Sequence, residues 1–302
     1  MKNKILIWGI GKEFWKSYNI LMLTVEKANL EIVGYVSRDK IRDSVDGKKV
    51  FSPEEVSQNG IEYENIIVTT DVYYKEICNY GSNILNIDRK KYINGRVLKI
   101  PHFDWDKYIR IYNSNISFIA EFCWGGVLSG KLGLPFNSPF VNVSVGIKKD
   151  DYFDLIYNLD KYMEVSPQAF SKSKYKYFNC NGWEHRGNYP KLWYEDIAIH
   201  GFHYRTQEDF FRCFERRRMR YNSQNKFILK ALYDQSDIEK FEQIKSDKKL
   251  GFFCGKTDKK NIISLAPKCW HDYNYAYAVY LNQLVESEEF FSYIDIFSLL
   301  DG

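Results

Sequence analysis

The sequence has little excess charge of either sign. Its 302 residues include 43 basic and 39 acidic side chains, and the formal net charge is +4. Domains that bind nucleic acid normally carry a strong and clustered basic excess, so we expect no nucleic-acid partner. Hydrophobic residues make up 45% of the chain. Intrinsic disorder is therefore excluded, because disordered chains combine low hydrophobicity with high net charge.

Paired cysteines are absent. The six cysteines fall singly along the chain, at Cys78, Cys123, Cys180, Cys213, Cys254 and Cys269. Without a CxxC pair the usual zinc signature is missing, and the spacings give no disulfide framework. Single thiols in a large domain favour a reducing compartment, so we expect a cytoplasmic protein.

Long apolar runs are also missing. The run at residues 5–8 ends at Gly9, which is too short for the core of a signal peptide. The best candidate for a membrane span, residues 116–128, is interrupted by Glu121. We therefore expect no integral membrane segment. The chain also contains no internal repeat and no low-complexity tract.

Aromatic residues are abundant and make up 17% of the chain. A codon bias toward Lys, Asn, Ile and Tyr explains most of this excess. A minority of the rings lie beside candidate functional residues, where they could stack on a sugar because aromatic rings offer flat apolar surfaces. These are Trp124, Trp183, Tyr189, Phe202 and Tyr204.

The first hundred residues predict an α/β domain with a parallel sheet. Apolar runs typical of buried strands occur at residues 4–8, 31–36, 65–70 and 83–87. Helical patterns lie between them at residues 12–29 and 72–80. Alternating strands and helices imply a parallel sheet covered by helices, so residues 1–103 are expected to form a small Rossmann-like domain. The glycines at Gly9 and Gly11 make a nucleotide or nucleotide-sugar the expected ligand of this domain.

Residues 104–302 predict a second α/β domain with a mixed sheet, which would carry the active site. Strands are expected at residues 140–145, 196–204, 226–233, 250–254 and 261–265. Helices are expected at residues 152–163, 207–220 and 274–285. Residues 166–190 predict a long loop, which in a compact domain is either functional or poorly ordered.

A glycine turn follows the first predicted strand. Gly9 and Gly11 occupy two positions of a dinucleotide-binding fingerprint, where the backbone approaches a phosphate at a helix N-terminus. Phe14 replaces the third glycine, and the carboxylate expected at the end of the second strand is missing. Arg38 is a candidate phosphate ligand there. The alternative is a turn with a purely structural role.

Cys123 and two histidines are the candidates for nucleophilic catalysis. A thiol needs a base within hydrogen-bond reach or a positive field to act as a nucleophile at neutral pH. His200 and His203 are the nearest candidates by chemistry, although an ideal strand would point them to opposite faces. A bulge at Gly201 would allow both to face one pocket. The alternative is that Cys123 is a small buried apolar residue.

Arginines form a stripe along the helix predicted at residues 207–220. Arg212, Arg216 and Arg220 recur every four residues, and Arg217 lies beside them. The planar guanidinium group suits phosphate or carboxylate binding, so Arg216, Arg217 and Arg220 are candidate substrate ligands. The alternative is a solvated helix face.

Two groups of motifs resemble known bacterial families. Ile7–Gly11, Gly34–Val36, Phe51–Val56 and Ile66–Val68 resemble the Rossmann-like domain that precedes sugar O-acyltransferases and other surface-polysaccharide enzymes, some of which bind a nucleotide-sugar there. Residues 113–267 resemble a family of unknown function associated with exopolysaccharide biosynthesis. The motifs that carry this second resemblance are Cys123–Gly126, Leu132–Pro139, Tyr189–Pro190, Ile199–Tyr204 and Arg217–Asn225.

The second resemblance adds Trp124, Tyr204 and Asn225 as candidate substrate ligands. The sequence departs from the family pattern at Glu121–Phe122, where asparagines are usual, and at Cys213–Phe214 in place of a tryptophan region. The resemblance implies a role in surface polysaccharide synthesis without implying a reaction.

Three functions remain in competition. The first is a transferase that moves an acyl, sugar or phosphoryl group to a nucleotide-sugar or glycan. The second is a non-catalytic protein that binds a nucleotide-sugar or glycan. The third is an NAD(P)-dependent oxidoreductase, against which Phe14 and the missing carboxylate both count.

Overall fold

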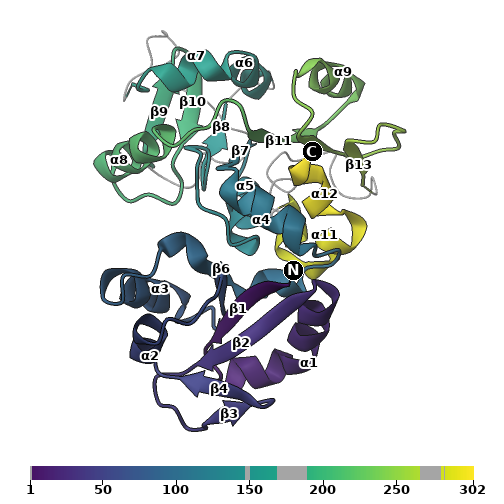
Figure 1. Ribbon diagram of the computed structural model, residues 1–302. Coiled ribbons are helices and arrows are strands. Elements are labelled where there is room, and N and C mark those ends of the chain that lie inside the picture. The colour runs from purple at the N-terminus through teal and green to yellow at the C-terminus, as the bar shows by residue number, and fades with distance from the viewer. Residues whose placement is uncertain (1, 147–149, 169–188, 266–279, 282) are drawn as a thin grey trace. The chain divides into compact units, whose positions relative to one another are not determined.

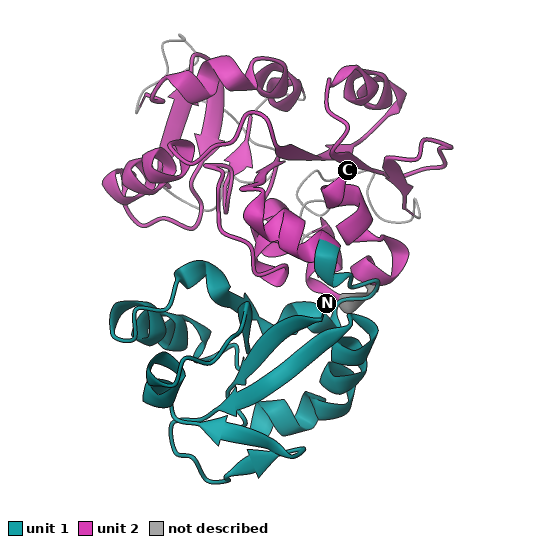
Figure 2. Cartoon of the chain, in the orientation of Figure 1, with its two compact units in different colours: residues 1–106 teal, residues 107–302 magenta. Residues whose placement is uncertain are grey.

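The computed structural model describes residues 2–146, 150–168, 189–265, 280–281 and 283–302 (Figure 1). The chain divides into two compact units, residues 1–106 and 107–302 (Figure 2). Both contain sheets and helices, which confirms the predicted α/β class. No helix in the described ranges has the length and apolar character needed to cross a membrane.

Unit 1 is built on a sheet with the strand order β3-β4-β2-β1-β5-β6. Only the β3–β4 pair is antiparallel. The strands are β1 (Asn3–Trp8), β2 (Leu30–Val36), β3 (Ser44–Val45), β4 (Lys48–Phe51), β5 (Asn65–Val68) and β6 (Tyr92–Asn94). The helices are α1 (Lys12–Lys27), α2 (Pro53–Gln58) and α3 (Tyr74–Asn83), with 3₁₀ turns at Arg89–Lys91 and Gly95–Lys99.

Helices cover both faces of this sheet. α1 lies on one side, and α2 and α3 lie on the other (Figure 1). Because β1 is buried on both faces, it reads as a continuous apolar run, as central parallel strands do. β2 and β5 flank β1 on opposite sides, so the strand order reverses there. Ligands bind at such points in open α/β sheets.

The strand predicted at residues 83–87 is wrong. α3 continues to Asn83, and Asn86 has a φ of 54°, which a strand cannot contain. The last strand of the sheet is instead β6, which pairs with β5. The apolar signal at residues 83–87 arose because Leu85 and Ile87 pack onto the core from a loop.

Unit 2 contains two sheets. One is entirely parallel, with the order β13-β12-β11-β7, and the other is antiparallel, with the order β8-β10-β9. The strands are β7 (Ser117–Ala120), β8 (Ser144–Val145), β9 (Lys191–Tyr194), β10 (Ile197–His200), β11 (Lys226–Leu232), β12 (Lys249–Phe253) and β13 (Ile262–Ser264). The helices are α4 (Trp105–Asn113), which begins at the end of unit 1, α5 (Trp124–Lys131), α6 (Asp151–Tyr157), α7 (Leu159–Glu164), α8 (Gln207–Arg218), α9 (Gln235–Gln243), α11 (Glu288–Tyr293) and α12 (Ile296–Asp301).

One apolar core joins the two sheets of unit 2. It contains Ile119 and Ile228 from the parallel sheet, Ile199 from the antiparallel sheet, and rings from α6, α8 and α9. The Tyr152 hydroxyl oxygen in α6 lies 2.9 Å from the carbonyl oxygens of both Ile119 and Leu229, which ties the helix to the two strands. β7 and β11 are thereby held in fixed positions relative to α6.

Several predicted segments of unit 2 differ in the structure. The strand expected at residues 140–145 is reduced to β8, and the one expected at residues 196–204 ends at His200. The single helix expected at residues 152–163 is divided into α6 and α7 at Asn158. Most of the loop predicted at residues 166–190, and with it Trp183, lies outside the described residues, as does part of the helix predicted at residues 274–285.

Candidate functional site

Cys123 lies at the carboxyl end of β7, between the strand and α5. Two glycines bring the helix close to the strand. A Cβ atom on Gly125 would lie 2.6 Å from Ala120 Cβ, and one on Gly126 would lie 2.8 Å from Val141 Cγ1. Both distances are shorter than real carbon contacts, so larger residues would push the helix away. The Cys-Trp-Gly-Gly motif therefore fixes Cys123 at the sheet edge where parallel sheets place their ligands.

His203 reaches Cys123 from a turn. β10 ends at His200, and a hydrogen bond of 3.0 Å from Tyr204 N to Gly201 O closes the turn that follows. Because β10 ends at His200, His203 is not part of the strand, and the alternation of a strand does not point the two histidines to opposite faces. Cys123 Sγ lies 3.1 Å from His203 Nε2. The structure thus brings together a thiol and an imidazole that are 80 residues apart in sequence.

The thiol of this pair is protonated at neutral pH. Cys123 is half-buried, and burial raises its pKa to about 11. The resting pair is therefore a neutral thiol beside an imidazole rather than a thiolate beside an imidazolium. Attack by sulfur then requires the imidazole to accept the thiol proton as the new bond forms, which is general-base catalysis.

His200 has a different setting from that of His203. Its side chain is buried, its Nε2 lies 3.0 Å from the carbonyl oxygen of Gly146, and its ring stacks on Phe202. Desolvation lowers the pKa of His200 to about 4, so the ring is neutral and donates its N–H to Gly146. His200 therefore lies outside the thiol pair.

We predict that His200 makes unfolding pH-dependent. Its pKa is about 4 in the folded chain against 6.5 when unfolded, so between these values only the unfolded chain takes up the proton. Stability is therefore full above pH 6.5 and falls as the pH drops toward 4, by at most about 3 kcal/mol. The His200→Gln variant keeps an N–H donor but has no group that takes up this proton, so it should lose less stability over the same pH range. Urea unfolding of both proteins between pH 7 and pH 4 gives the comparison, and parallel pH curves would contradict the assignment.

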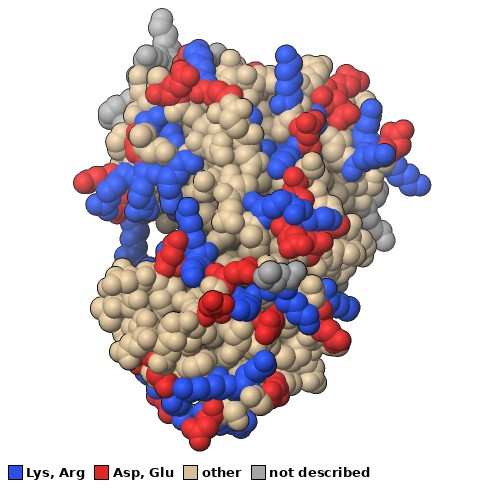
Figure 3. Space-filling view, in the orientation of Figure 1, with Lys and Arg blue, Asp and Glu red and all other residues tan. Residues whose placement is uncertain are grey.

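The arginines lie on α8, which is also in unit 2. Among them, Arg217 contacts the turn that carries His203. Arg217 Nη1 donates to Tyr204 Oη at 2.7 Å and to the carbonyl oxygen of Val141 at 3.1 Å. Arg216 Nη2 lies 3.7 Å from Cys213 Sγ, and Arg220 is exposed in the turn that follows α8. Figure 3 shows basic side chains gathered over α8.

Two predicted substrate ligands are not placed as expected. Trp124 is fully buried and packs on Phe252, with 4.8 Å between ring centroids, so it belongs to the core and offers no face for sugar stacking. Asn225 precedes β11 and bonds to Ser114 O and Lys248 Nζ. Because β7 and β11 are parallel, this position lies at the opposite end of the sheet from Cys123. Asn225 is therefore a structural residue of that end.

A buried ion pair involving Glu121, two residues before Cys123, was not predicted from the sequence. Lys230 Nζ lies 2.8 Å from Glu121 Oε2, and the two side chains are 1% and 9% exposed. Burial raises the pKa of Glu121, while the Lys230 ammonium opposes that shift. Two features of the sequence could have revealed this pair. One is a lysine inside the otherwise apolar strand at residues 227–232, and the other is the departure from the family pattern at Glu121. Only the parallel register of β7 and β11 sets them opposite each other.

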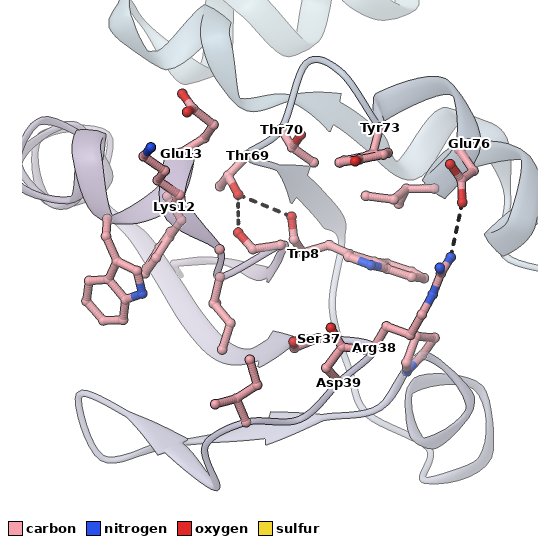
Figure 4. Close-up of a pocket in the computed structure, with 18 of the residues that line it drawn as sticks. Trp8, Lys12, Glu13, Ser37, Arg38, Asp39, Thr69, Thr70, Tyr73 and Glu76 are labelled. Atoms are coloured by element: carbon pink, nitrogen blue, oxygen red, sulfur yellow. Dashed lines mark hydrogen bonds and ion pairs between the residues drawn. The ribbon is translucent and has the colours of Figure 1, made fainter.

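Unit 1 holds a separate cavity of about 670 Å³ at the carboxyl ends of β1, β2 and β5 (Figure 4). Gly9, Gly11 and Arg38 all line it. Arg38 is paired with Glu76 at 3.2 Å, and Thr69 bonds to the carbonyl oxygens of Trp8 and Gly9 (Figure 4). Other lining residues are mainly apolar or aromatic, among them Ile10, Trp15, Ile41, Pro53, Tyr73, Ile77 and Tyr80.

The glycine turn leaves space for a ligand where it lines this cavity. Gly9 has a φ of 101°, a conformation that residues with a Cβ rarely adopt. A Cβ on Gly11 would meet no atom within 4 Å, so the space above Gly11 is empty. No side chain caps α1, and its first N–H groups therefore remain available to a ligand. Lys12, Arg38 and Arg42 are balanced by Glu13, Asp39 and Glu76 around the rim.

No cluster of three or more His, Cys, Asp or Glu side chains suited to a metal ion occurs among the residues that the structure covers.

The fold and site define an α/β protein with a thiol–imidazole pair at the edge of a parallel sheet. Residues 94–295 match the family described as "Domain of unknown function (DUF1919)", and the chain belongs to this family. Residues 1–93 match the family described as "C2185-like, N-terminal". These matches confirm the predicted membership of a family of unknown function.

A relative from Haemophilus influenzae (strain ATCC 51907 / DSM 11121 / KW20 / Rd) carries the description "Uncharacterized protein". It is 26% identical to this chain over 146 residues, which cover 47% of this chain and 64% of the relative. The chain thus matches less than two thirds of the length of that protein.

Proposed function

We propose that the chain is a transferase of surface polysaccharide synthesis that uses Cys123 as its nucleophile and His203 as its base. The observation that carries this proposal is the 3.1 Å contact between Cys123 Sγ and His203 Nε2 at the carboxyl edge of a parallel sheet. A buried structural cysteine would not need an imidazole at this distance. The polysaccharide context comes from the resemblance of both parts of the chain to enzymes and families of that process.

Acyl transfer is the reaction that fits a neutral thiol–imidazole pair best. His203 Nε2 accepts the thiol proton while sulfur bonds to the acyl carbon of the donor, and the donor's leaving group departs with that proton. An acceptor hydroxyl then gives its proton to His203 and attacks the thioester, which transfers the acyl group and restores the thiol. The uncapped start of α5 supplies backbone N–H groups close to the sulfur, where negative charge develops on the acyl oxygen.

The test is direct detection of the acyl-enzyme. The full chain is mixed with acetyl-CoA or with the chromogenic ester p-nitrophenyl acetate, and the modified residue is located by mass spectrometry after proteolysis. We expect one acetyl group on Cys123 and none in the Cys123→Ala variant. Cys213→Ala is the matched control, because Cys213 is also a free, half-buried cysteine of unit 2. Acetylation that is equal in the wild type and in Cys123→Ala would exclude the proposal.

A second candidate function, nucleotide-sugar binding, is favoured by the cavity of unit 1. The volume of about 670 Å³, the aromatic lining and the open glycine turn at a helix N-terminus all suit a phosphate-bearing ligand with a flat base. This binding can accompany catalysis or replace it. A ligand that stabilises Cys123→Ala as much as the wild type, with no turnover in either protein, would favour a binding protein.

We predict that the two glycines of the turn respond differently to substitution. Gly11→Ala has room for its methyl group and should fold normally, but the methyl group fills the space where a phosphate would approach. Gly9→Ala is strained at a φ of 101° and should lower stability by about 1 kcal/mol or more.

Thermal shifts with acetyl-CoA, several nucleotide-sugars and NAD(P) measure both effects. A nucleotide-sugar shift that disappears in Gly11→Ala supports the site, and an unchanged shift contradicts it. A shift with NAD(P) alone would instead favour the oxidoreductase.

A further inference from the structure

Positive charge without matching acids gathers at the carboxyl end of α8 and in the turn that follows it. Arg212 and Arg218 are paired with Asp209 and Glu215, at 2.6 Å and 2.8 Å. Arg216, Arg217 and Arg220 have no carboxylate partner within the parts of the chain that the structure describes. Arg220 lies four residues after Arg216 and three after Arg217, and its backbone N–H donates to the carbonyl oxygen of Arg217 at 3.0 Å. Three unneutralised guanidinium groups therefore lie within about one turn of one another along the chain.

These three groups lie close enough to repel one another. Partial burial and the charges of Arg216 and Arg217 together lower the pKa of Arg220. The negative end of the α8 dipole offsets only a small part of this repulsion, since it carries about half a charge. A polyanionic ligand would remove the repulsion, whereas a solvated helix face would let the side chains spread apart.

Arg217 is held in place by a network that leads to the thiol pair. One branch runs through Tyr204, which accepts from Arg217 and adjoins His203 in the turn. The other branch runs through Val141, whose carbonyl oxygen accepts from Arg217 and whose side chain packs on Gly126 near the start of α5. Arg217 also lies over the Phe136 ring, 5.7 Å from its centroid. The guanidinium is therefore positioned by the same two segments that carry His203 and Cys123.

We infer that Arg216, Arg217 and Arg220 bind a phosphate or diphosphate ester, and that this group anchors the substrate whose acyl chemistry takes place at Cys123. Three positive charges match a group with at least two negative charges, and a single carboxylate would leave most of them unneutralised. The phosphate group and the reacting acyl carbon are different parts of this substrate, because Tyr204 and His203 lie between Arg217 and Cys123. Only the second part, that the bound group anchors the substrate of Cys123, rests on the proposed function. The first part, binding of the anion, can be measured without turnover.

Calorimetric titration of the full chain with inorganic pyrophosphate, at constant ionic strength, tests the site. We expect Arg216→Gln and Arg220→Gln each to weaken binding about tenfold, the loss of one charge-assisted hydrogen bond. Both side chains are exposed, so these variants should fold. Arg212→Gln is the matched control, because Arg212 is an exposed arginine of the same helix whose charge Asp209 already neutralises. Its affinity should stay close to that of the wild type.

Two results would overturn the inference. One is the absence of measurable pyrophosphate binding, and the other is equal weakening in Arg212→Gln, which would show general attraction to a basic surface. Sodium acetate at the same concentration should give no heat, and acetate that competes with pyrophosphate on equal terms would exclude a site for a multivalent anion. The Cys123→Ala variant should keep its pyrophosphate affinity. Failure of the transferase proposal would therefore appear in acylation, and failure of this inference would appear in the titration.

Discussion

Removing the imidazole of His203 is expected to slow acylation of Cys123 by about 10²- to 10⁴-fold, the usual contribution of a positioned general base. The thiol has a pKa of about 11, so only a very small fraction is thiolate at neutral pH. Without an acceptor at 3.1 Å the thiol proton must pass to water. The rate of p-nitrophenolate release from p-nitrophenyl acetate measures this step in the wild type and in His203→Ala.

His200→Gln is the matched control for that experiment. His200 is also a histidine of the β10 region, but its Nε2 bonds to Gly146 rather than to the thiol. We expect its substitution to change stability and to leave the acylation rate largely unchanged. His203 is exposed, so its removal should leave the fold intact. A larger loss in His200→Gln than in His203→Ala would reverse the assignment of the base.

Replacing Lys230 with methionine is expected to destabilise unit 2 by about 3–5 kcal/mol, because it leaves the buried Glu121 carboxylate without its partner. Lys230 is 1% exposed, so water cannot replace the lost ammonium. Denaturant unfolding measures the effect. Lys226→Met is the control, since Lys226 lies on the same strand and pairs with the exposed Asp160, and its loss should cost less than about 1 kcal/mol.

The double variant Lys230→Met with Glu121→Leu completes the thermodynamic cycle. Removing both charges should recover most of the lost stability, because an apolar pair can replace a buried ion pair at little cost. A double variant as unstable as Lys230→Met alone would show that packing, rather than the unpaired carboxylate, accounts for the loss. A Lys230→Met variant no less stable than Lys226→Met would contradict the buried pair itself.

Much of unit 1 could be predicted because its central strands are largely buried. β1, β2 and β5 appear as continuous apolar runs, and the glycine turn marks where the first strand ends. The last strand could not be predicted in the same way. β6 has only three residues, and the apolar residues that precede it belong to a loop that packs on the core. The apolar pattern at residues 83–87 reflects burial of the side chains, and loop residues can be buried as well as strand residues.

The candidate site could be predicted by residue type but not by geometry. Cys123 and the two histidines stand out by their chemistry, yet the length of β10 decides which histidine meets the thiol. Gly201 begins the turn because a Cβ there would lie 2.7–2.9 Å from the Phe210 ring. That contact joins residues from different elements, so no local pattern reveals it. The Glu121–Lys230 pair depends in the same way on the register between β7 and β11.

The pH dependence of Cys123 acylation shows whether His203 accepts the thiol proton. If His203 accepts the thiol proton, acylation of the wild type should proceed well below pH 11 and should not rise with pH in proportion to the thiolate fraction. In His203→Ala the rate should instead rise about tenfold per pH unit toward the thiol pKa of about 11, since only thiolate reacts. Profiles that superimpose would show that the 3.1 Å contact carries no proton during the reaction, and the account of Cys123 and His203 as a catalytic pair would be wrong.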